Sequence, residues 1–149
     1  TVGEAEIASA ILTVLERQKL MVEGAGAVGV AAAMYGELDL RGKTVCALLS
    51  GGNLDVTMLE RIITRGLARE GRTVGFSTVL PDRPRALAGL LGIVSELGAN
   101  VLEVGHERSS LKADLGSTVV HLLVETRNRA HVDELFDALH REGYQLIQR

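Results

Sequence analysis

A serine and two glycines that follow an apolar run are the residues of this chain most suited to binding a ligand or a cofactor. The run covers residues 45–49 and leads into Ser50-Gly51-Gly52-Asn53. Glycines let the backbone approach a ligand closely, and the helical pattern that follows presents free N–H groups at its start. A buried strand would deliver this turn to the carboxyl edge of a parallel sheet, where α/β proteins place their ligands. The alternative is an ordinary strand–turn–helix junction, because glycine-rich turns are common.

Histidine and cysteine, the other residue types that often do chemistry, form no comparable pattern. His106 and His121 fall on predicted strands and can be neighbours across a sheet, whereas His131 and His140 fall on a predicted helix. Neither a cysteine partner nor a helical histidine pair with a carboxylate accompanies them, so we expect no metal site. We place the histidines on an exposed face or at a subunit contact. The single cysteine, Cys46, lies inside the apolar run and is expected to be a small buried hydrophobe.

Composition narrows the class of protein. The chain has 149 residues, of which 46% are hydrophobic and 3% aromatic, so its core must consist of aliphatic side chains. The net charge is -3 with acids and bases interspersed, which argues against a nucleic-acid surface. No segment is long and apolar enough to span a membrane, and no signal-peptide pattern follows Thr1. We therefore expect a cytoplasmic, soluble protein that is a processed product or a piece of a longer chain.

Helices and short apolar runs alternate in the first half of the chain. The sequence predicts a helix over 4–18, a strand over 20–22, a glycine turn over 23–29 that feeds a helix to about 34, and a strand over 45–49. It also predicts a helix that Asp55 caps and that ends near 70. This order is typical of the tail of a doubly wound α/β domain. Two strands cannot form a stable parallel sheet alone, so the region resembles the end of something larger. The polar residues 68–72 mark a domain boundary.

The second half of the chain has a different order of predicted strands and helices. Strands are predicted over 73–80, 100–109, 117–127 and 144–148, with a loop over 111–116. Helices are predicted from about Pro84 or Arg85 to 97, with Gly98 as the stop, and from the N-cap Asn128 to Gly143. The order β-α-β-β-α-β gives a four-stranded antiparallel sheet with two helices on one face, the ferredoxin-like arrangement.

These motifs resemble two parts of one known family. Residues 73–149 resemble an ACT domain, a small amino-acid-sensing module, through Leu80-Pro81-Asp82-Arg83-Pro84-Arg85-Ala86-Leu87 and Leu97-Gly98-Ala99-Asn100-Val101. Residues 1–72 resemble the carboxyl end of the catalytic domain of threonine dehydratase (threonine ammonia-lyase), through Glu23-Gly24-Ala25-Gly26-Ala27-Val28-Gly29 and Leu48-Leu49-Ser50-Gly51-Gly52-Asn53. The fold that this implies is the α/β tail of a pyridoxal-phosphate-dependent domain followed by an α+β ferredoxin-like βαββαβ (ACT) domain.

The resemblance implies a cofactor pocket that this chain completes only in part. In the family the serine that matches Ser50 hydrogen-bonds the pyridine nitrogen of pyridoxal phosphate, Gly51 and Gly52 keep the cofactor edge uncrowded, and Glu23 lines the pocket. The alternative for Glu23 is a helix-end acid near free N–H groups. The family's Schiff-base lysine and phosphate cradle lie in an amino-terminal part, and none of Lys19, Lys43 and Lys112 stands in a Ser-Phe-Lys context. We expect no catalytic residue and no bound cofactor on this chain alone.

The ACT resemblance implies an effector site at the first strand–helix junction. Residues 82–87, namely Asp82, Arg83, Pro84, Arg85, Ala86 and Leu87, would hold an amino acid, with isoleucine or valine expected. The helix start would offer N–H groups to its carboxylate, Asp82 would accept from its ammonium group, and Asn100 would bond either group. Arg85 stands where the family often has glycine, so its side chain would either crowd the site or bind a carboxylate itself. The alternatives are a locally bonded turn for Asp82 and Arg83, and a strand-entry residue for Asn100.

Three functions remain open from the sequence. The first is a regulatory portion of threonine dehydratase, an ACT homo-oligomer that senses an amino acid. The second is a structural ACT-like dimerisation module whose ligand site Arg85 has closed. The third is an enzyme that is completed by a separate amino-terminal chain.

Overall fold

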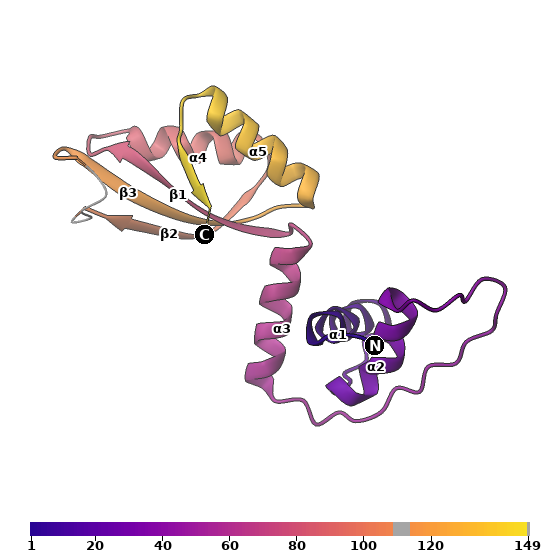
Figure 1. The fold of residues 1–149 in the computed structure, drawn as a ribbon. Helices are drawn as coiled ribbons and strands as arrows, with labels where there is room; N and C mark the ends of the chain where they lie inside the picture. The colour runs from indigo at the N-terminus through magenta and orange to yellow at the C-terminus, as the bar shows by residue number, and fades with distance from the viewer. Residues whose placement is uncertain (109–113, 149) are drawn as a thin grey trace. The chain divides into compact units, whose positions relative to one another are not determined.

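The computed structural model describes residues 1–108 and 114–148, and it divides into two compact units, Thr1–Gly66 and Leu67–Arg149 (Figure 1). The division falls inside a helix, ahead of the predicted boundary between 72 and 73, which stays a prediction. Ser109, Lys112 and the predicted loop at 111–113 lie outside the described residues.

Helices dominate the first unit. α1 (Glu4–Gln18) and α2 (Gly24–Tyr35) pack together around a small aliphatic core, and α3 (Val56–Arg69) begins in this unit. α1 has the predicted bounds. The predicted glycine turn at 23–29 is wrong, because its glycines lie within α2. Gly26 is buried there, and any side chain at that position would overlap the backbone carbonyl of Ser50. The glycine therefore serves close packing and not a turn.

The strands predicted at 20–22 and 45–49 are not formed in the part of the first unit that the structure describes. Both segments are irregular in their backbone conformation. A strand exists only through backbone bonds to a neighbour, and an apolar sequence cannot supply that neighbour. Val45 and Leu48 are consequently exposed, and so is Cys46, which makes the prediction of a buried cysteine wrong.

Asp55 caps α3 as predicted. Its carboxylate accepts hydrogen bonds from the backbone N–H groups of Thr57 at 2.7 Å and Met58 at 3.4 Å. These bonds, with a contribution from the Thr57 side chain, hold the pKa of Asp55 below its ordinary value because they favour the ionised carboxylate.

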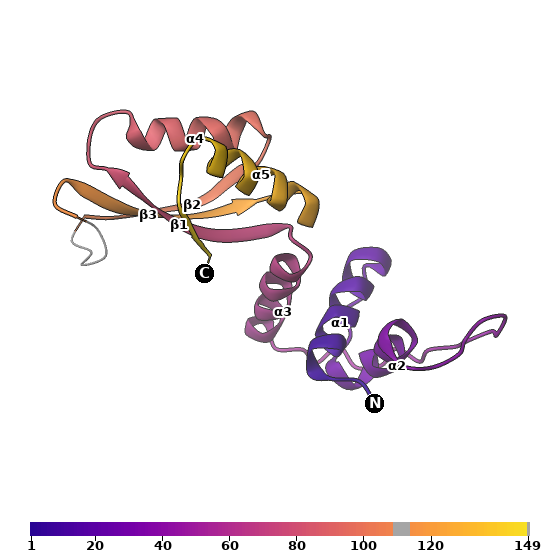
Figure 2. The same ribbon diagram turned by 45° about the horizontal axis from the view of Figure 1, so that its top comes forward.

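The second unit is a four-stranded antiparallel sheet in the order β2-β3-β1-β4. Its strands are β1 (Thr73–Pro81), β2 (Asn100–Glu107), β3 (Ser117–Glu125) and β4 (Leu146–Gln148). Helices α4 (Ala86–Glu96) and α5 (Arg129–Arg141) both cover the same face of the sheet (Figures 1 and 2). This element order and strand order confirm the ferredoxin-like prediction.

The core of the second unit lies between the sheet and the two helices. Alternate residues of β1 and β3 face it, and Phe76 meets Phe136 of α5 edge to face, with ring centroids 5.6 Å apart. Thr78 also points into this core and is fully buried, yet its hydroxyl has no hydrogen-bond partner among the described residues.

Capping residues mark the start of α5 and the ends of α4 and α5, as predicted. The Asn128 side chain accepts from His131 N at 3.0 Å at the start of α5, and Gly98 and Gly143 adopt positive φ angles after α4 and α5. The prediction that His131 is exposed is wrong, because it is 2% exposed. Its Nδ1 accepts from Arg127 N at 3.1 Å, and its Nε2 lies 3.0 Å from Leu97 O. The ring thus joins the end of α4 to the start of α5.

A β-bulge interrupts β2. Val101 pairs with Val124 and Glu103 pairs with the next residue of β3, Leu123, so Leu102 is extra. After the bulge, His106 pairs with the buried Val120 and therefore faces the helices.

Candidate functional site

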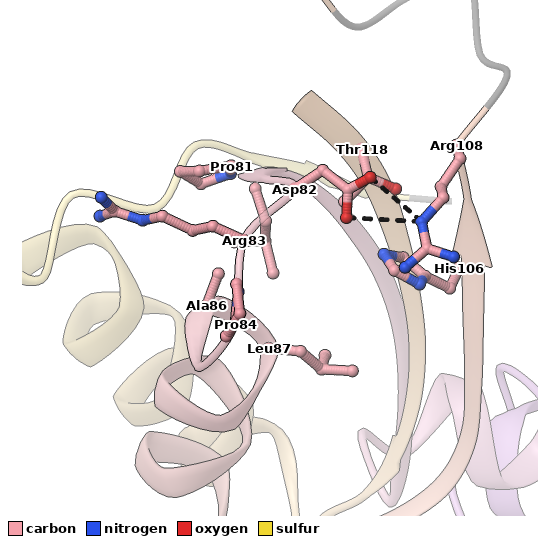
Figure 3. A pocket seen from close by; sticks show the side chains of 10 residues that line it. Pro81, Asp82, Arg83, Pro84, Ala86, Leu87, His106, Arg108 and Thr118 are labelled. Atoms are coloured by element: carbon pink, nitrogen blue, oxygen red, sulfur yellow. Dashed lines mark hydrogen bonds and ion pairs between the residues drawn. The ribbon is translucent and has the colours of Figure 1, made fainter. Parts of the chain in front are cut away.

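A cavity of about 280 Å³ opens at the end of β1, where the chain turns into α4 (Figure 3). The turn itself contributes Pro81, Asp82, Arg83 and Pro84, and the first turn of α4 contributes Ala86 and Leu87. Leu80 of β1, His106 of β2 and Thr118 of β3 line the cavity from the sheet, and Arg108 lines it from directly after β2.

Strand direction brings these residues together. β1 ends where the antiparallel β3 begins, since Pro81 pairs with Ser117, and β2 ends beside the same part of β3, since Glu107 pairs with Val119. The carboxyl ends of β1 and β2 and the start of β3 therefore meet at the same end of the sheet. The turn is held there by a bond from Asp82 N to Gly116 O at 2.8 Å.

Opposite charges lie side by side in the cavity. The Arg108 Nε atom is 3.1 Å from Asp82 Oδ2 and 3.4 Å from Asp82 Oδ1, and the two side chains point toward each other (Figure 3). Thr118 donates its hydroxyl hydrogen to Glu107 O at 3.0 Å, which leaves the lone pairs of that hydroxyl able to accept.

The rest of the lining is suited to an aliphatic group. Leu80, Ala86 and Leu87 present apolar surface, and the first turn of α4 adds backbone N–H groups that lack partners within the helix. A site with an anion, a cation, free N–H groups and an apolar wall can bind a small molecule that carries both charges and a short hydrocarbon side chain.

Two residues of the predicted effector site lie outside the cavity lining. Arg85 is the N-cap of α4 with φ 74°, a left-handed conformation that favours glycine, and it is absent from the lining. Asn100 lies at the opposite end of the sheet, where it pairs with Glu125 and donates from Nδ2 to Glu125 Oε2 at 3.3 Å. The remaining members, Asp82, Arg83, Pro84, Ala86 and Leu87, are brought together.

Sequence reasoning missed His106, Arg108 and Thr118 as lining residues. Simple alternation from the inward-facing Val101 would turn residues 103, 105 and 107 toward the helices. The bulge at Leu102 reverses that alternation, so His106 faces the cavity instead. The sequence offers no local signal for the bulge, whereas Thr118 could have been found from its even spacing with the buried Val120 and Leu122.

The residues predicted to face pyridoxal phosphate come together in the first unit. Glu23 N donates to Gly51 O at 2.8 Å, and Gly51, at φ 71°, lies so close to the Glu23 side chain that any side chain at this position would overlap it. Ser50 is exposed, and a Cβ atom on Gly52 would meet nothing within 4 Å. These features fit one open wall of a cofactor pocket, with a hydroxyl and free backbone edge available.

Other candidate sites receive no support from the described ranges. Within residues 1–108 and 114–148, no group of three histidine, cysteine, aspartate or glutamate side chains could hold a metal ion. In the same ranges no helix combines the length and the hydropathy needed to cross a bilayer.

Comparison with known proteins shows which curated enzymes are similar to this chain in sequence. No family model matches the chain. The L-threonine ammonia-lyase of Thermotoga maritima is 50% identical over 145 residues, which are 97% of this chain and 36% of that protein. The L-threonine ammonia-lyase of Geobacter sulfurreducens is 44% identical over 144 residues, which are 96% of this chain and 36% of that protein. The chain thus spans about a third of the length of these curated relatives.

Solved structures align with about half of the chain. The ACT domain from the GTP pyrophosphokinase of Chlorobium tepidum superposes with a TM-score of 0.39 and 16% identity, over 51% of this chain and 91% of that one. Along almost all of its sequence, the chain is similar to threonine ammonia-lyases, and the predicted resemblance to that family is confirmed.

Proposed function

We propose that this chain is the regulatory portion of a threonine ammonia-lyase, which converts L-threonine to 2-oxobutanoate and ammonia. In this proposal residues 1–72 complete the catalytic domain, and residues 73–149 form an ACT domain that senses an amino acid. The 50% identity to a curated enzyme over 97% of the chain supports the parent activity. The observation that carries the regulatory role is the cavity at the β1–α4 junction, which holds Asp82 and Arg108 beside apolar residues.

The catalytic cofactor of the whole protein would be pyridoxal phosphate, which when bound stabilises negative charge at the carbon next to the substrate's amino group. Ser50 would position the ring by donating to its nitrogen. Gly51 and Gly52 would leave the backbone edge open, and Glu23 would support the Gly51 turn through its backbone bond. A lysine from outside this chain would be required, so we expect the chain alone to be inactive.

Calorimetric titration tests the sensing role directly. We expect the 149-residue chain to bind L-isoleucine or L-valine with measurable heat and with an increase in thermal stability. The variant D82N should weaken binding, because it removes the charge that would pair with the ligand's ammonium group. Absence of both heat and thermal shift with isoleucine, valine and threonine would remove the sensing role.

A second candidate function is dimerisation through the ACT domain without ligand binding. The observation that favours it is the outer edge of β2, which is the end strand of the sheet and exposes Leu102 and Val104. Such an edge can pair with a second copy through its free backbone groups. Light scattering after size exclusion should show a dimer that V104K dissociates. L115K at a fully exposed turn position should leave the dimer intact, and a monomeric wild-type chain would contradict this function.

A further inference from the structure

The ion pair between Asp82 and Arg108 lies in the lining of the cavity and is not buried. The side chains are 36% and 69% exposed, and the closest approach is 3.1 Å. An exposed pair of this kind contributes little to folding, because water solvates both charges well when they separate. Each partner can therefore exchange the other for a ligand charge at small cost.

This arrangement selects among ligand classes by charge. A simple carboxylate would be attracted to Arg108 but repelled by Asp82, and a simple amine would meet the reverse. A molecule with an ammonium group and a carboxylate group on the same carbon atom satisfies both partners at once and leaves neither of these two charges unpaired. α-Amino acids have this form.

We infer that an α-amino acid binds by inserting between Asp82 and Arg108, and that Arg108 is the residue that recognises its carboxylate. The inference rests on the proposed sensing function and assigns a residue to it that lies outside the strand–helix turn. Asp82 takes the ammonium group, while the Arg108 guanidinium and the N–H groups at the start of α4 take the carboxylate.

The apolar wall determines which side chain fits. With the zwitterion held by the charged pair, the ligand side chain would lie against Leu80, Ala86 and Leu87. The aliphatic side chains that line this part of the cavity of about 280 Å³ suit an apolar group. A charged side chain would bring a third charge to an apolar surface that cannot pair it.

Titration of a matched arginine pair tests the role of Arg108. We expect R108Q to weaken L-isoleucine binding about 10- to 100-fold, the usual loss for a charge-assisted hydrogen bond. R108K should recover part of the affinity, because it keeps the charge but not the planar fork. R127Q serves as the control, because Arg127 also forms an exposed ion pair, with Glu134 at 3.6 Å, and is not part of the cavity lining. We expect this control to bind as the wild type does.

Ligand analogues separate the two charge contacts. 2-Methylbutylamine lacks the carboxylate of isoleucine, so it should bind the wild type weakly and should not lose affinity in R108Q. 3-Methylpentanoate lacks the ammonium group, so it should bind the wild type weakly and should gain affinity in D82N, which removes the repulsion.

The outcomes distinguish the inference from the function on which it rests. If the wild type binds isoleucine and R108Q binds it equally well, the assignment of Arg108 is wrong while amino-acid sensing stands. If R127Q weakens binding as much as R108Q, the loss of affinity comes from the lower net positive charge of the protein and not from a contact with the ligand. The assignment of Arg108 is then also wrong. If the wild type binds no amino acid, both are wrong.

Discussion

Arg85 is the residue at which local conformation conflicts most with residue type. Its φ of 74° lies in the left-handed region, and Lys19 is the other described non-glycine residue with a positive φ. A side chain in this region crowds its own backbone, whereas glycine does not. A glycine at this position would adopt the same backbone conformation without that crowding.

Replacing Arg85 by glycine should stabilise the second unit. We expect R85G to raise the free energy of unfolding by about 0.5–1 kcal/mol, because relief of the left-handed strain exceeds the entropy that glycine adds to the unfolded chain. R83G, at a residue without a positive φ, should lower it by about the same amount. Urea denaturation measures both. Isoleucine affinity should not change in R85G, since Arg85 does not line the cavity; a large gain in affinity would favour the closed-site hypothesis.

Thr78 offers a second change that should increase stability. Its hydroxyl is buried without a partner among the described residues, so valine of the same shape should raise the free energy of unfolding by about 1 kcal/mol. Thr126 is the matched control, because it is also buried but donates to Gly71 O at 2.6 Å. T126V should lower the free energy of unfolding by about 1 kcal/mol. Equal effects of the two substitutions in chemical denaturation would contradict this account.

At the scale of elements, His131 connects two helix ends. A backbone N–H donates to one ring nitrogen and a backbone carbonyl lies within hydrogen-bond distance of the other, so the neutral ring satisfies both. We expect H131L to lower the free energy of unfolding by about 2–3 kcal/mol, because Arg127 N and Leu97 O lose their partners. The exposed His140 on the same helix provides the comparison, and H140L should change stability by less than about 0.5 kcal/mol.

The start of α3 should respond to acid through Asp55. Its pKa is lowered in the folded chain by bonds from Thr57 and Met58, so its contribution to helix stability is complete above the unfolded pKa. That contribution is lost as the pH falls through the folded pKa. Protection of the Thr57 and Met58 amides against hydrogen exchange should decline across this acidic range. In D55N, which keeps an acceptor oxygen but does not titrate there, protection should not depend on pH in this range.

How far the sequence predicts each element depends on where its hydrogen bonds lie. The helices α3 and α5 have nearly their predicted bounds, because Asp55, Asn128 and Gly143 act within a few residues of the chain. The predicted strands at 20–22 and 45–49 are absent from the described part of the first unit. Their apolar character is local, but the partner that makes a strand is not.

The candidate effector site divides in the same way. The turn at Asp82–Pro84 and the start of α4 are contiguous, so the sequence locates them together. His106 and Arg108 reach the cavity through the pairing of β2 with β3 and through a bulge, and neither feature can be read from the neighbouring residues. Asn100 was assigned to the site by resemblance alone, and the register places it at the far end of the sheet.

At the scale of the whole molecule, two separate cores indicate two separately folding units. One core joins α1, α2 and Ile62, and the other fills the space between the sheet and its helices. We expect residues 67–149 to fold alone and to give amide spectra like those of the same residues in the full chain. L139A should lower the stability of this fragment by about 2–5 kcal/mol, since Leu139 is fully buried in its core. A collapsed, poorly dispersed spectrum for the fragment would contradict the division.

The bulge in β2 also governs how the length of this strand can vary. Leu102 is one residue more than the ladder needs, and half of its surface is exposed. A chain that lost one residue between 102 and 105 could absorb the loss by straightening the ladder, and His106 and Arg108 would still face the cavity. The deletion of a residue after His106 could not be absorbed by the bulge, and it would turn Arg108 away from the cavity. Relatives that are one residue shorter before His106 can therefore keep the same ligand chemistry, so an alignment gap at that point is no sign of a lost site.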